Sequence, residues 1–370
     1  MPDRTVLVLG NHPVDSWSMR HYSELLRDAY AAGPLEVDYA QPNDALSRAI
    51  PIAPLSHLVS HLENLVLFPL AMLRRARRAD VVHISDHGNG AWLLWPHLRR
   101  RAIITCHDLL AVRGSRREFP EHQPDTSEII RQRLIVRGIH RASMIHCISQ
   151  ATADDVAAEF PDVPARVIHN PMRAAFAPRE GGLAPEDRAR SGDALIVSNL
   201  VWRKRRDFAI RVWKRLRSQP GLSGMRLHLV GPPVTDQERA LLTGQEAAMI
   251  DQEENISDEA LAALYSKARV LLQLSRYEGF GWPVIEAQAL GAAVVCSDVP
   301  VFREVGGDGA LYVEDDLATV DWAALAERLQ TAELRRAGAA NAERFTFDEF
   351  VERLAALASE VAGSLPAASR

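Results

Sequence analysis

The sequence predicts an α/β protein built from two doubly wound parallel sheets. Short apolar runs rich in β-branched residues alternate with segments of helical period along almost the whole chain of 370 residues. Alternation of this kind is typical of a parallel sheet covered by helices. A stretch rich in Pro and Gly, residues 177–185, interrupts the pattern and divides it into two halves. The length also exceeds that of one ordinary domain.

Five apolar runs in the first half are expected to form strands. They span residues 5–9, 81–84, 103–106, 143–147 and 166–168. Helical periodicity is found between them, at 19–32, 55–78 and 128–140. The second half repeats the architecture without repeating the sequence. Strands are expected there at 194–198, 226–230, 270–274, 293–297 and 310–313, and helices at 204–217, 258–268, 283–290, 317–330, 333–344 and 348–361.

Composition excludes several classes of protein. The 43 basic and 48 acidic residues give a net charge of −5, which offers no basic surface for nucleic acid. Cys106, Cys147 and Cys296 are odd in number and far apart, so they encode no disulfide framework or zinc knuckle and fit a reducing, cytoplasmic compartment. The first ten residues have the pattern of a strand and not of a signal peptide. The longest apolar stretch, 62–73, is too short to span a bilayer.

Residues 275–286 form the most informative motif: a strand end, a loop with two glycines and a helix start. Gly279 and Gly281 permit positive φ angles and a close approach of the backbone to a ligand. Free N–H groups of the first helical turn attract phosphate or hydroxyl oxygens. Glu278 precedes the loop and Glu286 lies one turn inside the helix, so we expect both carboxylates to face one cleft and to bind sugar hydroxyls. The alternative is that Glu278 and Glu286 are ordinary acidic residues at a helix start or on the surface, and for either glutamate alone that interpretation would be preferred.

Arg203 and Lys204 follow an expected strand and open an expected helix. A guanidinium grips two phosphate oxygens at once, whereas an ammonium acts as a point charge. The pair would therefore stabilise the charge on a departing diphosphate, by the electrostatic logic of oxyanion sites. Arg205 and Arg206 follow directly, so residue type alone also allows a solvated basic helix start.

Two strand ends in the first half also bear polar side chains. His107 is expected to project from its strand into a cleft between the two halves of the protein. Asp108 would either orient His107 or cap the next segment. The alternative is a structural histidine. Asp86 and His87 follow the preceding strand, where they are candidates for acceptor contacts or merely form an Asx turn.

Arginines cluster at the end of the long apolar helix expected at 55–78 and in the segments that follow it. Four of them lie within 74–78, and others follow at 99–101 and 113–117. Basic residues beside an apolar helix suit a membrane surface with anionic lipids. The alternative is a core helix with a solvated end, because nearly all basic residues of this chain are arginines.

The stretch 275–286 resembles the Glu-x7-Glu signature of the family 4 glycosyltransferases, which are retaining enzymes with the GT-B fold. Five further segments resemble the family in order and spacing, namely 197–204, 229–232, 256–265, 287–298 and 303–306. The resemblance is strong from about residue 143 to 362 and looser before that. It is greatest to bacterial mannosyltransferases of polysaccharide biosynthesis.

This resemblance implies two domains that face each other across a cleft. An acceptor-binding domain would span 1–178, completed by a returning helix at 347–362, and a nucleotide-sugar-binding domain would span 194–346. Arg203 and Lys204 would clamp the donor diphosphate, and Glu286 would hold the nucleotide ribose.

The family also implies roles for the residues around the donor sugar. Glu278 would hold that sugar together with the backbone N–H groups of Gly279, Phe280 and Gly281. His107 resembles the active-site histidine of the family, which contacts the sugar near the reacting carbon.

The sequence departs from the family on the acceptor side. Many members have a Gly-Gly loop after the first strand, leading to a helix that contains an Arg. Residues 10–20 lack the Gly pair, although Arg20 could still reach a phosphate. Arg20, Asp86 and His87 are therefore the acceptor-side candidates.

The function implied is retaining transfer of a hexose from a nucleoside-diphosphate sugar to a hydroxyl acceptor in glycan or polysaccharide synthesis. No metal or other cofactor is expected. GDP-mannose is the favoured donor and UDP-glucose the next, the acceptor being a glycan or a lipid-linked glycan. A peripheral contact at the inner face of the membrane stays open. Two alternatives are a nucleotide-sugar epimerase of the same fold and a catalytically silent nucleotide-sugar-binding module. A dehydrogenase is disfavoured, because no Gly-x-Gly-x-x-Gly follows the first strand.

Overall fold

The computed structural model describes residues 4–12, 17–177 and 192–363. The chain divides into two compact units, of which the first comprises Met1–His169 and Phe347–Arg370 and the second Asn170–Thr346. Most of the Pro- and Gly-rich stretch at 177–185 lies outside the described residues.

The boundary between the units lies before Asn170, whereas the sequence placed the end of the first domain at residue 178. Backbone contacts explain the difference. The N–H of Met172 donates to the carbonyl of Phe345 at 2.7 Å, and the carbonyl of Pro171 accepts from Nε1 of Trp282 at 3.0 Å. Both partners belong to the second unit, so these residues are tied to it.

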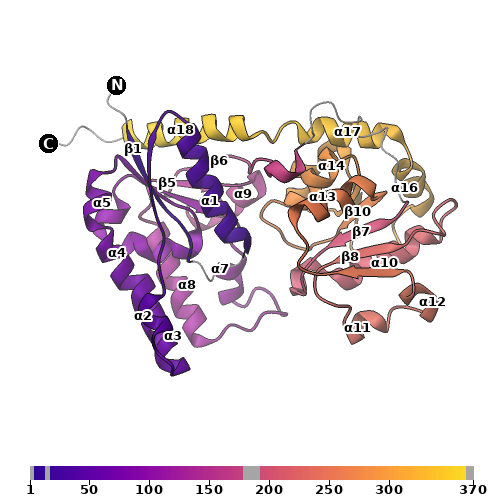
Figure 1. Cartoon of the computed structure of the whole chain (residues 1–370), viewed down its shortest axis with the longest axis horizontal. Helices are drawn as coiled ribbons and strands as arrows, with labels where there is room; N and C mark the ends of the chain where they lie inside the picture. The colour runs from indigo at the N-terminus through magenta and orange to yellow at the C-terminus, as the bar shows by residue number, and fades with distance from the viewer. Residues whose placement is uncertain (1–3, 13–16, 178–191, 364–370) are drawn as a thin grey trace. The chain divides into compact units, whose positions relative to one another are not determined.

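The first unit is built on a parallel sheet of six strands in the order β2-β1-β3-β4-β5-β6. The strands are β1 (Thr5–Leu9), β2 (Glu36–Ala40), β3 (Val81–Ile84), β4 (Ala102–Cys106), β5 (Met144–Cys147) and β6 (Ala165–Val167). The helices and helical turns (Figure 1) are α1 (Trp17–Ala32), α2 (Ala45–Arg48), α3 (Ala53–Leu62), η1 (Glu63–Leu67), α4 (Phe68–Ala71), α5 (Leu73–Arg78), η2 (His87–Leu94), α6 (Pro96–Arg99), α7 (Leu110–Ser115), α8 (Thr126–Ile139), α9 (Gln150–Glu159) and α18 (Phe347–Gly363).

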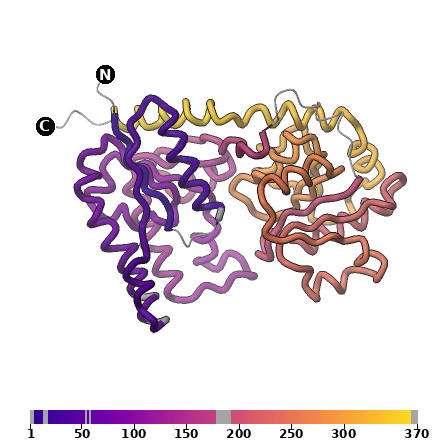
Figure 2. The backbone as a smooth tube through the Cα atoms, viewed as in Figure 1, coloured from indigo at the N-terminus to yellow at the C-terminus, as the bar shows by residue number. Residues whose placement is uncertain are grey.

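Both faces of this sheet are buried, as the unbroken apolar runs of its central strands require. Leu7 and Leu9 belong to a core cluster on one face together with Trp92 of η2. On the other face, α18 packs against α1, β3 and β4. Figure 2 shows the yellow α18 beside the indigo α1. The C-terminal helix thus returns to the first unit, as predicted.

The single helix expected at 55–78 is broken into α3, the π-helical turn η1, α4 and α5. Pro69 has no N–H to offer to the carbonyl of Leu65 four residues earlier, so a regular helix cannot continue there. Indole groups compensate, since Trp95 Nε1 donates to the carbonyl of Leu65 at 3.0 Å and Trp92 Nε1 to that of Asn64 at 2.9 Å.

The second unit contains a parallel sheet of six strands in the order β12-β11-β10-β7-β8-β9. The strands are β7 (Ala194–Val197), β8 (Leu227–Val230), β9 (Ile250–Glu253), β10 (Val270–Gln273), β11 (Ala293–Ser297) and β12 (Leu311–Val313). The helices and helical turns are η3 (Ala174–Phe176), η5 (Trp202–Lys204), α10 (Arg206–Arg217), α11 (Asp236–Arg239), α12 (Gly244–Ala247), α13 (Asp258–Lys267), α14 (Trp282–Ala289), α15 (Pro300–Gly306), η6 (Gly307–Gly309), α16 (Trp322–Leu329) and α17 (Ala332–Ala342).

The two sheets confirm the predicted fold class, and each has an internal reversal of strand order. In the second sheet β7 lies between β8 and β10, which gives the strand order of a dinucleotide-binding fold. In the first sheet β1 lies between β2 and β3. Open sheets of this kind bind ligands at the carboxyl ends of the strands on either side of the reversal. Functional side chains are therefore expected in the loops after β7 and β10 and after β1 and β3.

Candidate active site

The donor residues predicted in the second unit come together because β7 and β10 are neighbours in the sheet. Arg203 and Lys204 lie in η5, directly after β7, whereas Glu278 lies in the loop after β10. The backbone N–H of Arg276 donates to the carbonyl of Arg203 at 2.7 Å, which fastens the two loops to each other. Residues 75 positions apart in the sequence thus share one site.

Glu278 is the centre of this cluster. Its Oε2 accepts from Nη1 of Arg203 at 2.8 Å, and its Oε1 lies 2.5 Å from Nζ of Lys204. The hydroxyl of Ser275 also donates to Oε1 at 2.8 Å, and Nη1 of Arg203 donates further to the carbonyl of Tyr277 at 3.2 Å. The carboxylate therefore fixes both cations at the carboxyl ends of β7 and β10.

Electrostatics keeps Glu278 ionised. Burial alone would raise its pKa, but the charges of Lys204 and Arg203 and the hydrogen bonds from Lys204 and Ser275 lower the pKa below its ordinary value. One carboxylate is thus balanced against two cations. The excess positive charge can attract an anion such as a diphosphate.

The glycine loop begins α14 in the way the motif predicted. Gly281 is the N-cap of α14 and has a φ of 102°, a left-handed conformation that favours glycine. A Cβ at this position would come 2.9 Å from Cε1 of Phe302. Phe280 is buried and packs edge-on against Phe345 at 5.7 Å between ring centroids. Pro283 stands in the first turn, where its missing N–H leaves no helical bond unmade.

The sequence predicted that Glu286 would face an open cleft beside Glu278. In the structure it does not. It is completely buried, and its two oxygens have partners within the second unit. Oε1 accepts from Nε of Arg173 at 2.6 Å and Oε2 from the hydroxyl of Tyr265 at 3.3 Å. Nη1 of Arg173 also donates to Asp258 at 3.0 Å. Burial raises the pKa of Glu286, and the charge of Arg173 opposes that shift.

Arg173 is a residue that the sequence reasoning missed. It lies two positions after the Asn170-Pro171 pair and outside every recognised motif. Its side chain is 8% exposed, and its guanidinium carbon lies 4.3 Å from the ring centroid of Phe176. No periodicity or spacing in the sequence indicates Arg173, because its partners Asp258 and Glu286 lie 85 and 113 positions further along the chain.

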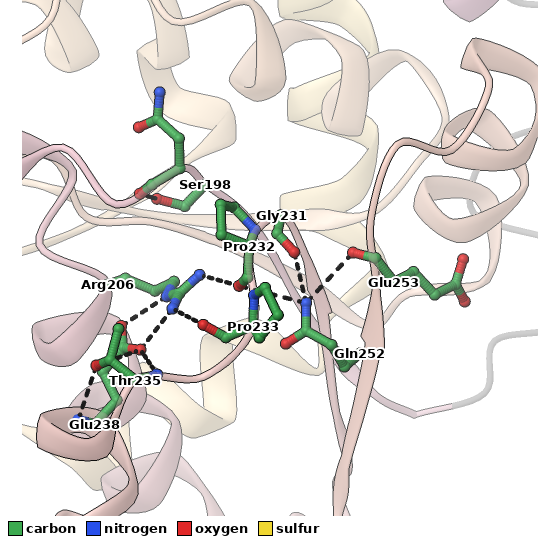
Figure 3. A network of polar contacts seen from close by, with 10 residues as sticks. Ser198, Arg206, Gly231, Pro232, Pro233, Thr235, Glu238, Gln252 and Glu253 are labelled. Carbon is green, nitrogen blue, oxygen red and sulfur yellow. Dashed lines mark hydrogen bonds and ion pairs between the residues drawn. The ribbon is translucent and has the colours of Figure 1, made fainter.

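The two arginines after Lys204 are structural. Arg206 is buried, and its Nε and Nη2 donate to the carboxylate of Glu238 at 2.6 and 2.5 Å. The same guanidinium donates to the carbonyls of Pro232 and Pro233 at 2.6 and 2.9 Å and so holds the loop after β8 (Figure 3). Arg205 pairs with Asp315. Only Arg203 and Lys204 of the four basic residues are bound to Glu278.

The loop after β8 requires a glycine at position 231, because the backbone of the loop after β7 comes very close to it. Gly231 has a φ of 142°, and a Cβ there would come 1.9 Å from the carbonyl oxygen of Ser198. Its own carbonyl accepts from Nε2 of Gln252 at 2.6 Å (Figure 3). The loops after β7 and β8 are thus in direct backbone contact.

In the first unit His107 lies at the carboxyl end of β4, as predicted. Its Nε2 lies 2.9 Å from the carbonyl of Ser85, so this nitrogen carries the proton and Nδ1 is the acceptor. The ring packs edge-on against Tyr22, with centroids 4.4 Å apart. Burial lowers the pKa of His107, so the imidazole is neutral at pH 7. Asp108 forms an Asx turn before α7 by accepting from the N–H of Leu110 at 2.9 Å, and the carbonyl of Ser85 orients the imidazole.

Asp86 and His87 stand at the end of β3, where Asp86 forms the Asx turn, and a role of Asp86 in acceptor contacts stays a prediction. Asp86 Oδ1 accepts from the N–H of Gly88 at 2.8 Å, which is the Asx turn, and the side chain also lines a cavity. His87 Nδ1 lies 3.2 Å from Asp86 Oδ1. Burial opposes the shift, but the hydrogen bond and charge of His87 lower the pKa of Asp86 to about 2. Arg20 is exposed on α1.

The cavity beside Asp86 has a volume of about 790 Å³ and opens at the reversal of strand order in the first sheet. His12 after β1 and Asn89 after β3 line it together with Asp86. Asn89 is fixed by donating to Asn11 at 2.7 Å. This is where a ligand of the first unit would bind by the rule for open sheets.

Neither a cluster of metal ligands nor a membrane-spanning helix is present in the described parts of the chain. In residues 4–12, 17–177 and 192–363, no three His, Cys, Asp or Glu side chains are placed to hold a metal ion. Independence from a metal stays a prediction. No helix in those same ranges is both long enough and apolar enough to cross a membrane.

Comparisons with known proteins identify both units. Residues 26–176 match the model of "Glycosyltransferase Family 4", and residues 186–345 match that of "Glycosyl transferases group 1". The O-antigen chain mannosyltransferase B of Escherichia coli is 26% identical over 278 residues, which are 71% of this chain and 70% of that protein. Shorter matches to the mannosyltransferases WbdA of Escherichia coli and RfbU of Salmonella typhimurium span 10% and 17% of those proteins.

Solved structures agree on the fold. Sucrose-phosphate synthase of Thermosynechococcus elongatus superposes with a TM-score of 0.71 at 17% identity, covering 98% of this chain and all of that one. The Anabaena protein HepE, solved with UDP and glucose, has a TM-score of 0.65 at 15% identity and covers 96% of this chain and all of that one. The two family models together account for most of the sequence. The chain therefore belongs to the family 4 glycosyltransferases and has the GT-B fold.

Proposed function

We propose that the protein transfers mannose from GDP-mannose to a hydroxyl group of a growing polysaccharide, with retention of the anomeric configuration. The cluster of Arg203, Lys204 and Glu278 at the reversal of strand order carries this proposal. Two fixed cations balanced by a single carboxylate suit a diphosphate leaving group. Mannose is favoured because the relatives named above are called mannosyltransferases, two of them of O-antigen chains.

In this proposal Arg203 and Lys204 bind the diphosphate and stabilise the charge that develops on it. Glu278 and the loop of Gly279, Phe280 and Gly281 hold the donor sugar. An oxygen of the departing diphosphate takes the proton of the acceptor hydroxyl on the same face of the sugar. No covalent intermediate on the protein is needed.

Glu286 and His107 complete the proposed donor site. Glu286 stays the candidate for the nucleotide ribose, but it has no exposed surface, so this contact requires Arg173 or Tyr265 to move away from its oxygens. His107 would offer Nδ1 as a hydrogen-bond acceptor to the sugar, since its Nε2 is committed to Ser85. Asp86, His87 and Arg20 stay the candidates for the acceptor side.

A thermal-shift panel of GDP-, UDP- and ADP-sugars tests the donor, because a bound ligand raises the melting temperature by mass action. We expect the largest shift with GDP-mannose, and UDP-glucose is the runner-up. Arg203→Ala should abolish the shift, whereas Arg211→Ala on the exposed face of α10 should retain it. A shift that survives in Arg203→Ala would refute the diphosphate assignment.

The reaction is tested by the product. Proton NMR of the product should show the α configuration of the donor. Turnover of the donor sugar to its epimer without acceptor would favour the epimerase alternative. Binding of the donor without any transfer, under every acceptor tried, would favour the silent binding module.

A peripheral contact with an anionic membrane is part of the proposal. Leu67 and Leu70 are 40% and 46% exposed, and the exposed Arg74, Arg77 and Arg78 follow them in α5. α5 packs against α6, which adds the exposed Arg99. Leucines beside cations suit lipid tails and anionic headgroups.

Co-sedimentation with vesicles tests this contact. Binding to phosphatidylglycerol vesicles but not to phosphatidylcholine vesicles is expected, and the triple change of Arg74, Arg77 and Arg78 to Gln should remove it. A matched triple change of the exposed Arg211, Arg215 and Arg239 in the second unit serves as the control. Equal binding to both kinds of vesicle would contradict an electrostatic contact.

A further inference from the structure

A second cavity of the first unit lies on the opposite face of α8 from the cavity beside Asp86. It has a volume of about 540 Å³ and lies between α7 and α8, which pack against each other (Figure 1). Val112 of α7 and Ile129 and Val136 of α8 supply its apolar lining. A cavity of this size can hold a small molecule that buries an apolar body and is oriented by a few polar groups.

Arginines supply the charge of this second cavity. Arg116, Arg133 and Arg137 line it, and no acidic residue of the described chain does. Arg116 is paired with Glu159, whereas Arg133 and Arg137 have no acidic partner within the described ranges. These two lie one helical turn apart on the same face of α8, so their charges repel each other unless an anion binds both.

Gln132 is a buried polar residue in the same lining. It is only 4% exposed, yet no hydrogen bond among the described residues satisfies its side-chain amide. Buried amides nearly always have a hydrogen-bond partner, and here a ligand in the cavity can supply one. The amide distinguishes this site from a mere pair of exposed cations. Arg211 and Arg215 have the same spacing on α10 and line neither cavity.

From these residues we propose that the first unit binds a phosphate ester between α7 and α8. A phosphate group offers three acceptor oxygens, which suffice for the guanidiniums of Arg133 and Arg137 and for the N–H groups of the Gln132 amide. A carboxylate has two oxygens, and a single guanidinium satisfies both. The organic part of the ester would cover Val112 and Val136. None of these residues belongs to the predicted donor or acceptor site, so the inference does not depend on the proposed function.

Calorimetry with phenyl phosphate tests the inference. The full chain is used as its Arg203→Ala variant, so that the predicted diphosphate site does not contribute to the signal. Phenyl phosphate should bind at least about tenfold more tightly than benzoate, which has the same ring but a carboxylate. It should also bind more tightly than inorganic phosphate, which has no apolar body. Added salt should weaken the binding, because Arg133 and Arg137 are exposed.

The double change Arg133→Gln/Arg137→Gln should lower the affinity for phenyl phosphate at least about tenfold. The matched control is Arg211→Gln/Arg215→Gln, which removes two arginines of the same spacing from α10 and should leave the affinity unchanged. Gln132→Met should weaken binding several-fold without lowering the melting temperature of the free protein, because it removes a buried group whose hydrogen bonds are unmade.

A phosphate ester can come from solution or from a lipid headgroup, and vesicles of phosphatidic acid distinguish the two sources. Loss of co-sedimentation in Arg133→Gln/Arg137→Gln would identify a headgroup. Unchanged co-sedimentation of that variant, together with its loss of phenyl phosphate binding in calorimetry, would identify a soluble ester.

Two results would overturn the inference at the level of the arginines. They are the absence of phenyl phosphate binding at millimolar concentration and an affinity that Arg133→Gln/Arg137→Gln and the control on α10 change equally. A Gln132→Met protein that binds normally but melts at a lower temperature would overturn it as well, since the amide would then serve the fold and not a ligand.

Discussion

Nε of Arg173 lies 2.6 Å from Oε1 of Glu286, a carboxylate with no exposed surface. The second acid of the Glu-x7-Glu pattern is thus held by a cation that the pattern does not contain. The hydroxyl of Tyr265 donates to the other oxygen of Glu286, and Asp258 accepts from a second nitrogen of the Arg173 guanidinium. Breaking such a buried pair is costly, because the remaining charge has no counter-charge and little water.

Arg173→Gln should therefore destabilise the protein by roughly 3–5 kcal/mol in urea denaturation. In Arg173→Gln/Glu286→Gln both charges are gone, so most of that loss should be recovered. A double variant as unstable as the single one would show that the packing of Arg173 on Phe176, and not the ion pair, sets its contribution.

Glu278→Gln separates binding from transfer. The change frees Arg203 and Lys204 from their counter-charge, so GDP should bind at least as tightly as in the parent protein. Transfer should fall by about two orders of magnitude, because both cations and the sugar lose the group that orients them. Calorimetry with GDP and an initial-rate assay measure the two effects. Weaker GDP binding in this variant would argue that Glu278 acts chiefly by positioning the cations.

Arg206→Met should lower stability by several kcal/mol. It leaves Glu238 buried without its partner and releases the loop that contains Pro232 and Pro233. Arg211→Met, on the exposed face of the same helix, should be close to neutral. The measurement is the urea midpoint of each variant. A neutral Arg206→Met would contradict a structural role for this arginine.

Gly281→Ala should cost at least about 1–2 kcal/mol and weaken donor binding. The residue has a φ of 102°, and the new methyl group would press on Phe302. Gly244→Ala is the control, because nothing lies within 4 Å of a Cβ there. Thermal melting with and without GDP-mannose measures both effects. Indistinguishable behaviour of the two variants would mean that the loop adjusts freely.

Stability should fall as the pH drops below about 6.5, owing to histidines buried between the first sheet and its helices. His83 bonds to Tyr30 at 2.8 Å and to Thr105 at 3.0 Å, and His146 bonds through Nε2 to the carbonyl of Ile168 at 3.0 Å. Burial lowers the pKa of His146 to about 4 and that of His83 well below its usual range.

The sign follows from the difference between the two states. In the unfolded chain these imidazoles titrate near 6.5, so below that pH the unfolded state binds more protons and gains stability relative to the folded one. The loss reaches about 1.4 kcal/mol per pH unit for each histidine between about pH 6.5 and 4. Urea unfolding from pH 7 to 5 measures the slope. His146→Gln should reduce it, and the exposed His140→Gln should not.

Much of the fold could be predicted from the sequence alone, because short unbroken apolar runs are typical of strands that are buried on both faces of a sheet. The strands that escaped prediction are β2 and β9, both at sheet edges and both rich in polar residues. An edge strand needs one partner and one buried face at most, so its sequence has a weak signal. The continuous helix expected at 55–78 failed at Pro69, where the indoles that satisfy the freed carbonyls come from a distant segment.

The sequence by itself determined which residue types form the donor cluster. A glycine-containing loop between a strand and a helix restricts the chemistry that is possible at that position. It also determined the order of strands along the chain. Only the tertiary structure decided that β7 lies against β10, that Glu278 takes Arg203 and Lys204 and not Arg206, and that Arg173 covers Glu286. Those pairings join positions far apart in the chain, and they depend on strand order and burial, which no local pattern encodes.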